Sequence, residues 1–249
     1  MIDTEQAVAS TGSPPPMTQM RWLEFSKLLS IQGLIAGVDE VGRGALFGPV
    51  VAAAVILPNS ALPELIAAEI KDSKKLSSSR RVQLQALIST LAIDWKIGFA
   101  STAEIDQMNI LQATMLAMKR AVLKLKVQPA LCLIDGNQLV KDLPLTQQTI
   151  VKGDEHSLAI ASASIVAKVW RDDLILRLAA KYPMYDLESN KGYGSQRHLM
   201  ALQKYGPSPL HRRSFRPCQM TGLSSLSQSV EISKKTRMSQ LGEGVRRKK

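Results

Sequence analysis

Two adjacent acids, Asp39 and Glu40, directly follow the apolar segment 34–38, which has the composition of a short β-strand. Neighbouring side chains of a regular strand point to opposite faces, so one acid would face covering structure unless the strand bends or ends there. A buried carboxylate is unfavourable unless it is paired or bound to a metal, so a divalent cation would stabilise this pair. The alternative is that both acids are ordinary strand-end residues that face water.

Two further acids occupy similar places in the chain. Asp135 ends the apolar segment 130–134, and Asp154 follows the strand-like segment 148–151. Ligands collect where the carboxyl ends of neighbouring strands converge. Mg²⁺ and Mn²⁺ prefer hard oxygen ligands, with water and substrate phosphate completing the shell. On a basic protein, such a cluster suits phosphodiester hydrolysis with two metal ions.

Three glycines, Gly42, Gly44 and Gly48, lie just after the first acids. Their spacing is not that of a dinucleotide-binding fingerprint, which also needs a helix next, whereas the apolar run 50–57 is typical of a buried strand. The interpretation that remains is that Gly42-Arg43-Gly44 lets the backbone approach a bulky ligand, with Arg43 available to a phosphate.

The elements that must position these residues alternate along the chain, which indicates one α/β domain with helices packed on a sheet. Strands are predicted at 34–38, 50–57, 94–100, 130–134 and 148–151, and helices at 77–91, 109–126, 157–181 and 196–204. We expect residues 1–20 to be a flexible leader, 21–216 the catalytic domain and 217–249 a disordered basic tail.

The charge of the chain points to a polyanionic partner such as nucleic acid. The net charge is +11, of which residues 21–215 carry +7, so the folded part is itself basic. Two unclustered cysteines make neither a disulfide framework nor a zinc site. The polar N-terminus has no signal-peptide pattern, and the run 49–58 is too short to cross a bilayer. We therefore expect a cytoplasmic monomer that does not bind membranes.

Seven blocks of the chain resemble, in order, the motifs of bacterial ribonuclease HII, a type 2 ribonuclease H. The blocks span about 31–215, and seven in order are highly specific although each is weak alone. There is no room before Ser30 for the extra N-terminal domain of ribonuclease HIII relatives, which favours HII. The blocks are Asp39–Gly44 with Gly48-Pro49, Asp72–Leu76, Ile134–Asn137, Lys152–Asp154, Ala163–Lys168 with Arg171-Asp172, Lys191–Gly194 and His211–Phe215.

The resemblance implies an RNase H-like mixed sheet flanked by helices, with a helical C-terminal extension. It implies that Asp39, Glu40, Asp135 and Asp154 form the catalytic metal site. Mn²⁺ or Mg²⁺ would bind there, two ions per active site with substrate bound. It also implies that the backbone of Gly42-Arg43-Gly44 senses a ribose 2′-hydroxyl, the group that separates RNA from DNA. Tyr193 would stack on the sugar at the RNA–DNA junction.

The function implied is that of an endoribonuclease with two related substrates. It would cut the RNA strand of RNA–DNA hybrids, and it would cut on the 5′ side of ribonucleotides embedded in duplex DNA. The products would carry a 5′-phosphate and a 3′-hydroxyl.

Five basic residues are further candidates for substrate contact, each with a plainer alternative: Lys74, Lys75, Lys168, Arg212 and Arg213. The first two, in a Ser-rich loop before a helix, are either a solvated pair or phosphate contacts. Lys168 would extend to the surface or to the substrate strand. The last two, with His211, form either a nucleic-acid patch or simple surface charge. Without the resemblance, Tyr193 could be a loop residue held against the core.

Two other functions fit parts of the pattern. A DNA nuclease or resolvase with an RNase H-like core would keep the fold and change the substrate. A non-catalytic nucleic-acid-binding module would bind in a salt-sensitive way without metal-dependent turnover. The acids count against the second alternative, because a binder of polyanions gains nothing from clustered carboxylates.

Overall fold

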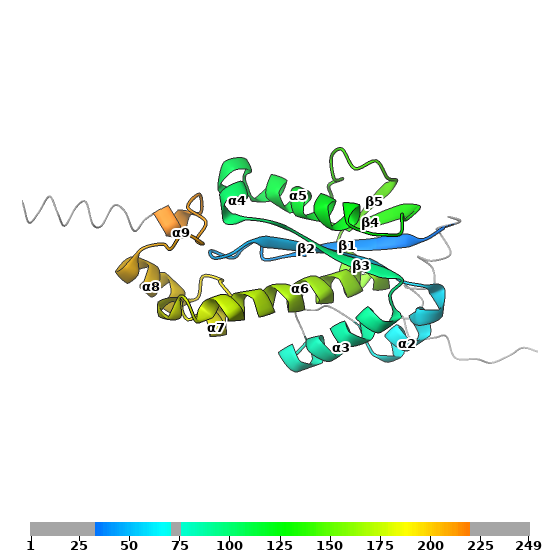
Figure 1. The fold of residues 1–249 in the computed structure, drawn as a ribbon, viewed down its shortest axis with the longest axis horizontal. Coiled ribbons are helices and arrows are strands. Elements are labelled where there is room, and N and C mark those ends of the chain that lie inside the picture. The colour runs from blue at the N-terminus through cyan, green and yellow to red at the C-terminus, as the bar shows by residue number, and fades with distance from the viewer. Residues whose placement is uncertain (1–32, 71–75, 220–249) are drawn as a thin grey trace, which may run out of the picture.

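The computed structural model describes residues 33–70 and 76–219, which form a sheet with helices on both faces (Figure 1). The sheet has five strands in the order β3-β2-β1-β4-β5. They are β1 (Ile35–Val41), β2 (Val50–Ile56), β3 (Asp94–Ala100), β4 (Leu131–Asp135) and β5 (Gln147–Ile150). The first three pair antiparallel, whereas β1 with β4 and β4 with β5 are parallel, so the sheet is mixed as expected.

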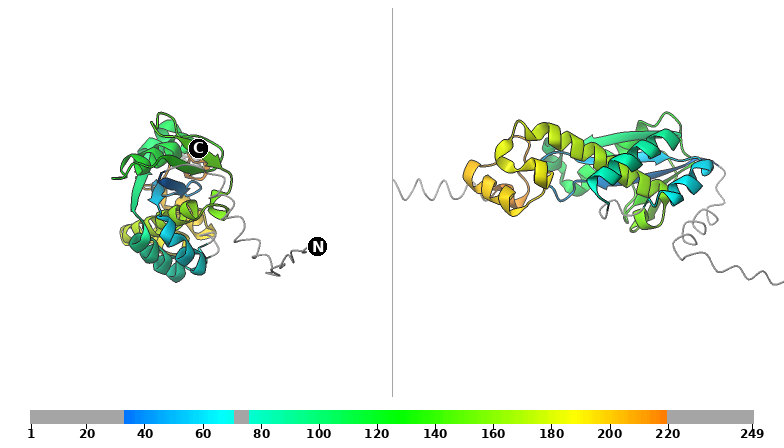
Figure 2. Two further views of the ribbon diagram at one scale, coloured as in Figure 1. Left: turned by 90° about the vertical axis from the view of Figure 1, so that its right-hand side faces the viewer. Right: turned by 90° about the horizontal axis from the view of Figure 1, so that it is seen from below.

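The helices divide between the two faces and one end of the sheet. Figure 1 shows α4 and α5 above the sheet and α6, α3 and α2 below it. Figure 2 shows from below that α8 and α9 lie at the end of the molecule away from α2. The helices are α2 (Leu62–Ala67), α3 (Ser78–Leu91), α4 (Thr102–Met108), α5 (Ile110–Leu123), α6 (Leu158–Ala179), α7 (Leu187–Asn190), α8 (Gln196–Tyr205) and α9 (Arg216–Gln219). Short 3-10 turns are η1 (Asn59–Ala61), η2 (Gly153–Glu155) and η3 (Pro183–Tyr185).

Close packing of the two long helices depends on small residues in the strands. Every residue of β2 is buried, which confirms the prediction of a buried strand from its continuous apolar run. A Cβ on Gly37 of β1 would lie 2.1 Å from the carbonyl carbon of Ala159 at the start of α6. A Cβ on Gly98 of β3 would lie 2.1 Å from the carbonyl oxygen of Ala117 in α5. These contacts bring the helix backbones directly onto the sheet, with α6 against β1, the strand that carries Asp39 and Glu40.

Several helix boundaries follow from side-chain caps. Ser77 accepts a hydrogen bond from the Arg80 amide at the start of α3, as its sequence position predicted. The helix predicted at 109–126 is α5, which begins after Asn109, whose left-handed φ of 73° ends the preceding helix. That preceding helix, α4, was not predicted; it starts with a capping box between Ser101 and Glu104.

The last described element, α9, contains the buried side chain of Cys218, so the expected boundary between residues 216 and 217 falls inside this helix. The predicted leader, most of the predicted tail, and Lys74 and Lys75 lie outside the described residues. Within residues 33–70 and 76–219, no helix is both long enough and apolar enough to cross a membrane.

Candidate active site

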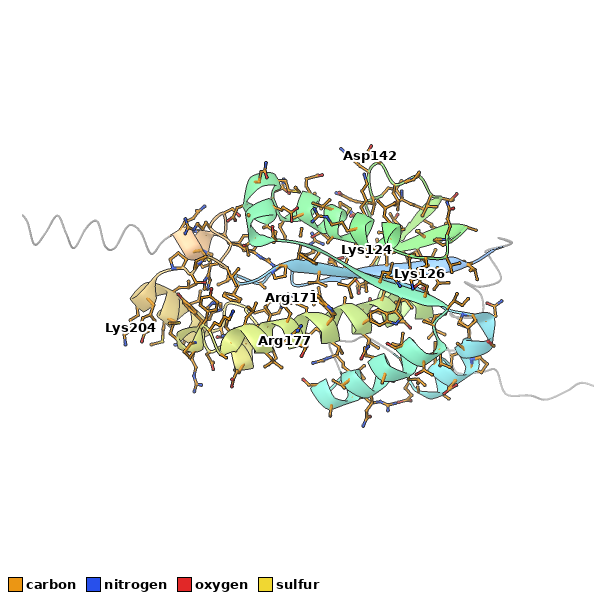
Figure 3. The ribbon with its side chains drawn as sticks, in the orientation of Figure 1. Lys124, Lys126, Asp142, Arg171, Arg177 and Lys204 are labelled. Carbon is orange, nitrogen blue, oxygen red and sulfur yellow. The ribbon has the colours of Figure 1, made fainter. Side chains whose placement is uncertain are left out.

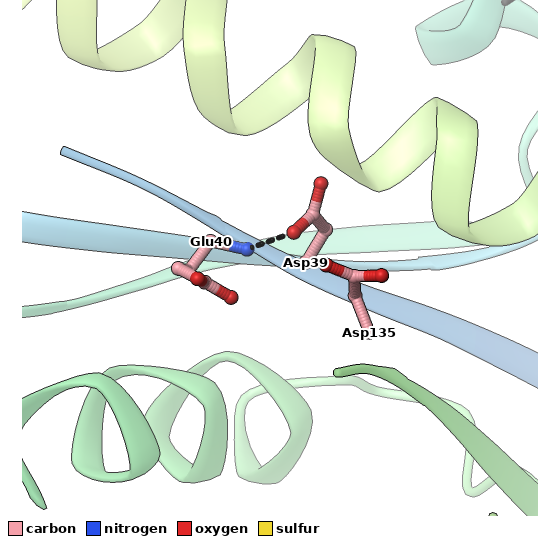
Figure 4. Close-up of side chains that lie close together, drawn as sticks. All are labelled: Asp39, Glu40 and Asp135. Atoms are coloured by element: carbon pink, nitrogen blue, oxygen red, sulfur yellow. Dashed lines mark hydrogen bonds between the residues drawn. The ribbon is translucent and has the colours of Figure 1, made fainter. Parts of the chain in front are cut away.

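Three acids meet at the centre of the sheet. Asp39 and Glu40 lie inside β1, opposite Ala53 and Ala52 of β2, so the strand continues through them and does not end before them. Asp135 is the last residue of β4, the parallel neighbour of β1. One carboxylate oxygen from each acid lies within 4.8 Å of the other two. Figure 4 shows Asp39 and Glu40 leaving β1 in opposite directions, with Asp135 next to Asp39.

The electrostatics of the three acids are unfavourable without a cation. Asp39 is only 5% exposed and accepts a 2.6 Å hydrogen bond from the Glu40 amide. Burial, and then the charges of Glu40 and Asp135, raise the pKa of Asp39 well above its ordinary value of 3.8. Burial also raises the pKa of Glu40. Buried carboxylates this close together fit a divalent cation, which takes oxygen ligands.

The side chain of Ser164, on α6, forms a hydrogen bond with Asp39 that opposes the rise in its pKa. Ser164 was not among the site residues predicted from the sequence. The face of α6 that Ser164 occupies packs on β1, because its neighbours in the helix are small. A serine among alanines on such a face was the available signal.

The fourth predicted acid, Asp154, is placed beside this cluster but is not one of its three members. It lies buried in η2, immediately after Gly153, whose amide donates a 2.7 Å hydrogen bond to Oδ1 of Asp135. The parallel pairing of β4 with β5 delivers η2 to this position. The structure thus brings Asp39, Glu40 and Asp135 together. Asp154 is the residue next to Gly153, which forms the hydrogen bond with Asp135.

The predicted glycine loop begins directly after β1, next to the acids. Arg43 is exposed and forms a 3.2 Å ion pair with Glu40. Gly42 has a φ of +87°, and a Cβ there would lie 2.2 Å from Nε of Arg171, so both its conformation and its surroundings require glycine. Gly44 is exposed and has open space where a Cβ would be. Its backbone is therefore accessible to a ligand.

Two buried guanidinium groups hold this loop in place through hydrogen bonds to backbone carbonyls. Arg212 donates to the carbonyl oxygens of Gly42 at 2.7 Å, Arg43 at 2.8 Å and Gly48 at 3.0 Å. Arg171, on α6, donates to the carbonyl oxygens of the neighbouring residues Phe47, Pro49 and Lys191. Figure 3 shows Arg171 on the side of the sheet that faces α6. Both arginine side chains have no exposed surface.

This burial corrects the expected surface patch of His211, Arg212 and Arg213. Only Arg213 is exposed, whereas His211 and Arg212 are buried. Burial, and then the nearby charge of Arg171, lower the pKa of Arg212 to about 9. The loop carbonyls compensate for the lost hydration of the two guanidiniums, and the hydrogen bonds of Arg212 are made to the glycine loop.

Tyr193 lies in a second loop that is joined to the first. The carbonyl oxygen of Gly192 accepts hydrogen bonds from the amides of Leu46 at 2.8 Å and Phe47 at 3.2 Å. The Tyr193 ring is half-buried, with the guanidinium of Arg171 5.4 Å from its centroid. The position of the ring is thus set by the same arginine that supports the glycine loop.

Lys168, one helical turn before Arg171 on α6, also lies near this ring. Its ammonium is 5.7 Å from the Tyr193 centroid and forms a 2.9 Å ion pair with Asp172. It therefore neither points freely into solvent nor packs in the core, and it lies beside the residue expected to contact the sugar.

A mixed five-stranded sheet with helices on both faces, and carboxylates gathered on its two central strands, is the architecture of the RNase H-like nucleases. A sequence model of the ribonuclease HII family matches residues 36–218, nearly the whole described part. The chain belongs to the ribonuclease HII family. Membership indicates RNase H activity on RNA–DNA hybrids.

Known relatives cover most of the chain. Ribonuclease HII of Trichormus variabilis is 69% identical over 222 residues, 89% of this chain and 99% of that protein. Ribonuclease HII of Trichodesmium erythraeum is 61% identical over 201 residues, 79% of this chain and 95% of that protein. Their shared name agrees with the match to the family model.

Solved structures share the fold. Ribonuclease H2 from Pyrococcus horikoshii superposes with a TM-score of 0.66 at 27% identity, over 76% of this chain and 96% of that chain. Bst-RNase HIII, solved in complex with Mn²⁺, superposes with a TM-score of 0.66 at 16% identity, over 87% of this chain and 75% of that chain. These likenesses confirm the RNase H-like fold expected from the sequence.

Proposed function

We propose that the chain is an endoribonuclease that cuts RNA–DNA hybrids and also cuts duplex DNA on the 5′ side of an embedded ribonucleotide. Its products would carry 5′-phosphate and 3′-hydroxyl ends. The observation that carries this proposal is the cluster of Asp39, Glu40 and Asp135, with oxygens within 4.8 Å, directly before a glycine loop whose backbone is open at Gly44. The acids fit phosphodiester chemistry, and the loop fits recognition of a sugar.

The acids would hold two divalent cations, Mg²⁺ or Mn²⁺, when substrate is bound. Asp39, Glu40 and Asp135 offer three oxygen ligands, and Asp154 would join them, since it is buried directly after the residue that contacts Asp135. When bound, the cations would activate the attacking water and stabilise the departing 3′-oxygen. The Mn²⁺ bound to Bst-RNase HIII supports this choice of ion.

The chain's own residues would select the ribonucleotide and orient the scissile phosphate. The backbone at Gly42-Arg43-Gly44 would contact the 2′-hydroxyl, because a glycine without a side chain leaves its N–H and C=O accessible. The Tyr193 ring would stack on the sugar next to the junction. The exposed side chain of Arg43 would leave Glu40 and bind a phosphate, as its fork geometry suits.

Cleavage of a DNA duplex that contains one ribonucleotide tests the proposal. We expect the wild type with Mg²⁺ or Mn²⁺ to cut once, on the 5′ side of the ribonucleotide, and to stop when a chelator is added. Asp39→Asn and Asp135→Asn should each lower kcat by more than about 100-fold, because each removes a charged ligand. Asp142→Asn is the matched control, since Asp142 has a side chain that is 90% exposed on the loop after β4.

Three outcomes would contradict the proposal. Full activity of either Asp39→Asn or Asp135→Asn would disprove the assignment of the metal site. Equal cleavage of an all-DNA duplex would favour the alternative of a DNA nuclease with the same fold. Salt-sensitive binding without metal-dependent turnover would instead indicate a binding module.

A further inference from the structure

Two buried histidines lie side by side behind the Tyr193 loop, and neither belongs to the acid cluster. His198 is on α8 and His211 is in the segment before α9; their exposed fractions are 0% and 1%. Their Nε2 atoms are 2.9 Å apart. The rings of Phe47 and Tyr185 pack edge-on against His211 at centroid distances of 5.1 and 4.6 Å. Buried polar atoms need hydrogen-bond partners, so one of these two Nε2 atoms must carry a proton and the other must accept it.

Hydrogen bonds at the two outer nitrogens determine that arrangement. The Ser208 amide donates to Nδ1 of His211 at 2.9 Å, so this nitrogen carries no proton. A neutral His211 therefore has its proton on Nε2 and donates to Nε2 of His198. His198 then has its proton on Nδ1, which lies 2.8 Å from the carbonyl oxygen of Tyr193. For two neutral imidazoles, the donation runs in one direction, from Ser208 to Tyr193.

This hydrogen-bond chain connects the segment that supports the glycine loop with the backbone of Tyr193. His211 pairs with Phe47 as an isolated β-bridge, next to the amides that hold Gly192. At the other end, the Tyr193 carbonyl also accepts a 2.8 Å hydrogen bond from the Ser195 amide. The two donors together fix the peptide plane that follows the Tyr193 ring.

We propose that His198 and His211 are positioning residues, which hold Tyr193 in its place through this one-way chain of two neutral imidazoles. The proposal rests on the proposed function, because it gives His198 and His211 their effect through the contact of Tyr193 with the sugar. Neither histidine touches substrate. Their role is to keep the Tyr193 loop and the glycine loop in fixed positions relative to each other.

A proton added to either ring breaks the chain. On His198 it would be on Nε2 and would face the Nε2–H of His211; on His211 it would be on Nδ1 and would face the Ser208 amide. Burial lowers the pKa of both histidines, and that of His211 falls to about 4. Asp186, before α7, acts in the opposite direction on His198. The Ser208 hydroxyl also lies 2.9 Å from Nδ1 of His211, and the Tyr185 hydroxyl donates to the Gly206 carbonyl. Arg212, next to His211 in the chain, donates to the carbonyls of the glycine loop. The neutral chain is therefore intact at neutral pH.

The first test measures the tautomers directly, by long-range ¹⁵N–¹H NMR of the imidazoles in the full chain without substrate. We expect His198 protonated on Nδ1 and His211 on Nε2, with neither ring charged at neutral pH. Either ring titrating near its ordinary pKa of about 6.5, or His198 protonated on Nε2, would overturn the proposal. This measurement is independent of catalysis.

The second test compares His198→Asn with His198→Leu. The Asn amide nitrogen replaces Nδ1 and can still donate to Tyr193, whereas Leu fills space without donating. On the single-ribonucleotide duplex we expect Leu to lower kcat/KM about tenfold and Asn to recover most of the loss, both being folded by circular dichroism. Equal losses in both variants would overturn the positioning role. Full activity of Tyr193→Ala would disprove the sugar contact instead, and the tautomers would remain a separate result.

Discussion

At the scale of the residue, the dominant feature is a carboxylate that the fold holds in an unfavourable place. Asp39 is buried among the charges of Glu40 and Asp135, and burial is the largest cause of its raised pKa. For an acid whose pKa is higher in the folded than in the unfolded state, the folded protein binds more protons between the two values. Stability without metal is therefore greater at low pH and is lost as pH rises through the raised pKa. A bound cation would reverse this loss.

Replacing Asp39 by Asn should stabilise the metal-free protein. At pH 8 in the presence of a chelator, we expect Asp39→Asn to raise the free energy of unfolding by more than about 1 kcal/mol, because it removes a buried like charge. The gain should shrink as pH falls, and Mg²⁺ or Mn²⁺ should stabilise the wild type more than the variant. Thermal unfolding with and without metal measures both effects.

Asp142→Asn is again the control, since it removes an exposed charge and should not change stability at either pH. A variant at Asp39 that is less stable than the wild type in chelator would mean that the carboxylate stabilises the fold without metal. The repulsion inferred for the cluster would then be wrong.

At the scale of the element, two loops from distant parts of the chain act as one unit. The loop after β1 and the loop before α8 share the hydrogen bonds of Gly192, and Arg171 from α6 contacts both. Arg212 then fixes three carbonyl oxygens on the first loop. The three bonds come from three different nitrogens of the planar guanidinium, whereas all the donors of an ammonium group are on one nitrogen and cannot span the same three carbonyls.

Arg212→Lys should therefore loosen the glycine loop although it keeps the charge. We expect a loss of roughly 3 kcal/mol in the free energy of unfolding, because buried carbonyls lose their donors. We also expect a smaller preference for a single-ribonucleotide duplex over all-DNA. Denaturant unfolding and paired cleavage assays measure the two effects. Arg213→Lys, the exposed neighbour, should leave stability unchanged, and equal behaviour of the two variants would contradict the positioning role of Arg212.

At the scale of the whole molecule, positive charge is spread beyond the active site. Residues 21–215 carry +7 of the net +11, and residues 220–249 contain seven Lys and Arg against two Glu. Contacts between such charges and phosphates release counterions, so they make affinity depend on salt. The charges of the C-terminal segment would then add affinity without selecting a cleavage position.

Deleting residues 220–249 should lower the affinity for a hybrid duplex and flatten its dependence on salt concentration, with the cleavage position unchanged. Binding titrations at several salt concentrations measure the slope, and cleavage mapping on the single-ribonucleotide duplex measures the position. A full-length chain with Lys and Arg of this segment changed to Gln is the matched control for length. An unaltered slope in both proteins would show that the segment makes no phosphate contacts.

Local pattern in the sequence was sufficient for the framework of the fold and for most of the acid cluster. The apolar run of β2 and the patterns of the helices α3 and α6 are local signals, and these elements were predicted correctly. Asp39 and Asp135 come together because β1 and β4 pair in parallel. The sequence indicated that acids at strand ends would converge, but it did not indicate which strands pair. The helices α2 and α4 were missed because each is only six or seven residues long, too short for a clear period.

Hydrophobic period and residue type therefore predict the strands, the long helices and the acids at the strand ends. Long-range packing in the folded chain determines which basic side chains are buried. Arg212 and Gly42 are 170 positions apart, and Arg171 and Phe47 are 124 apart. Both arginines bind backbone carbonyls, which every residue has, so no pattern of side chains marks them. The hydrogen-bond chain from His211 through His198 to Tyr193 could not be predicted from the sequence for the same reason, since its last acceptor is the backbone carbonyl of Tyr193.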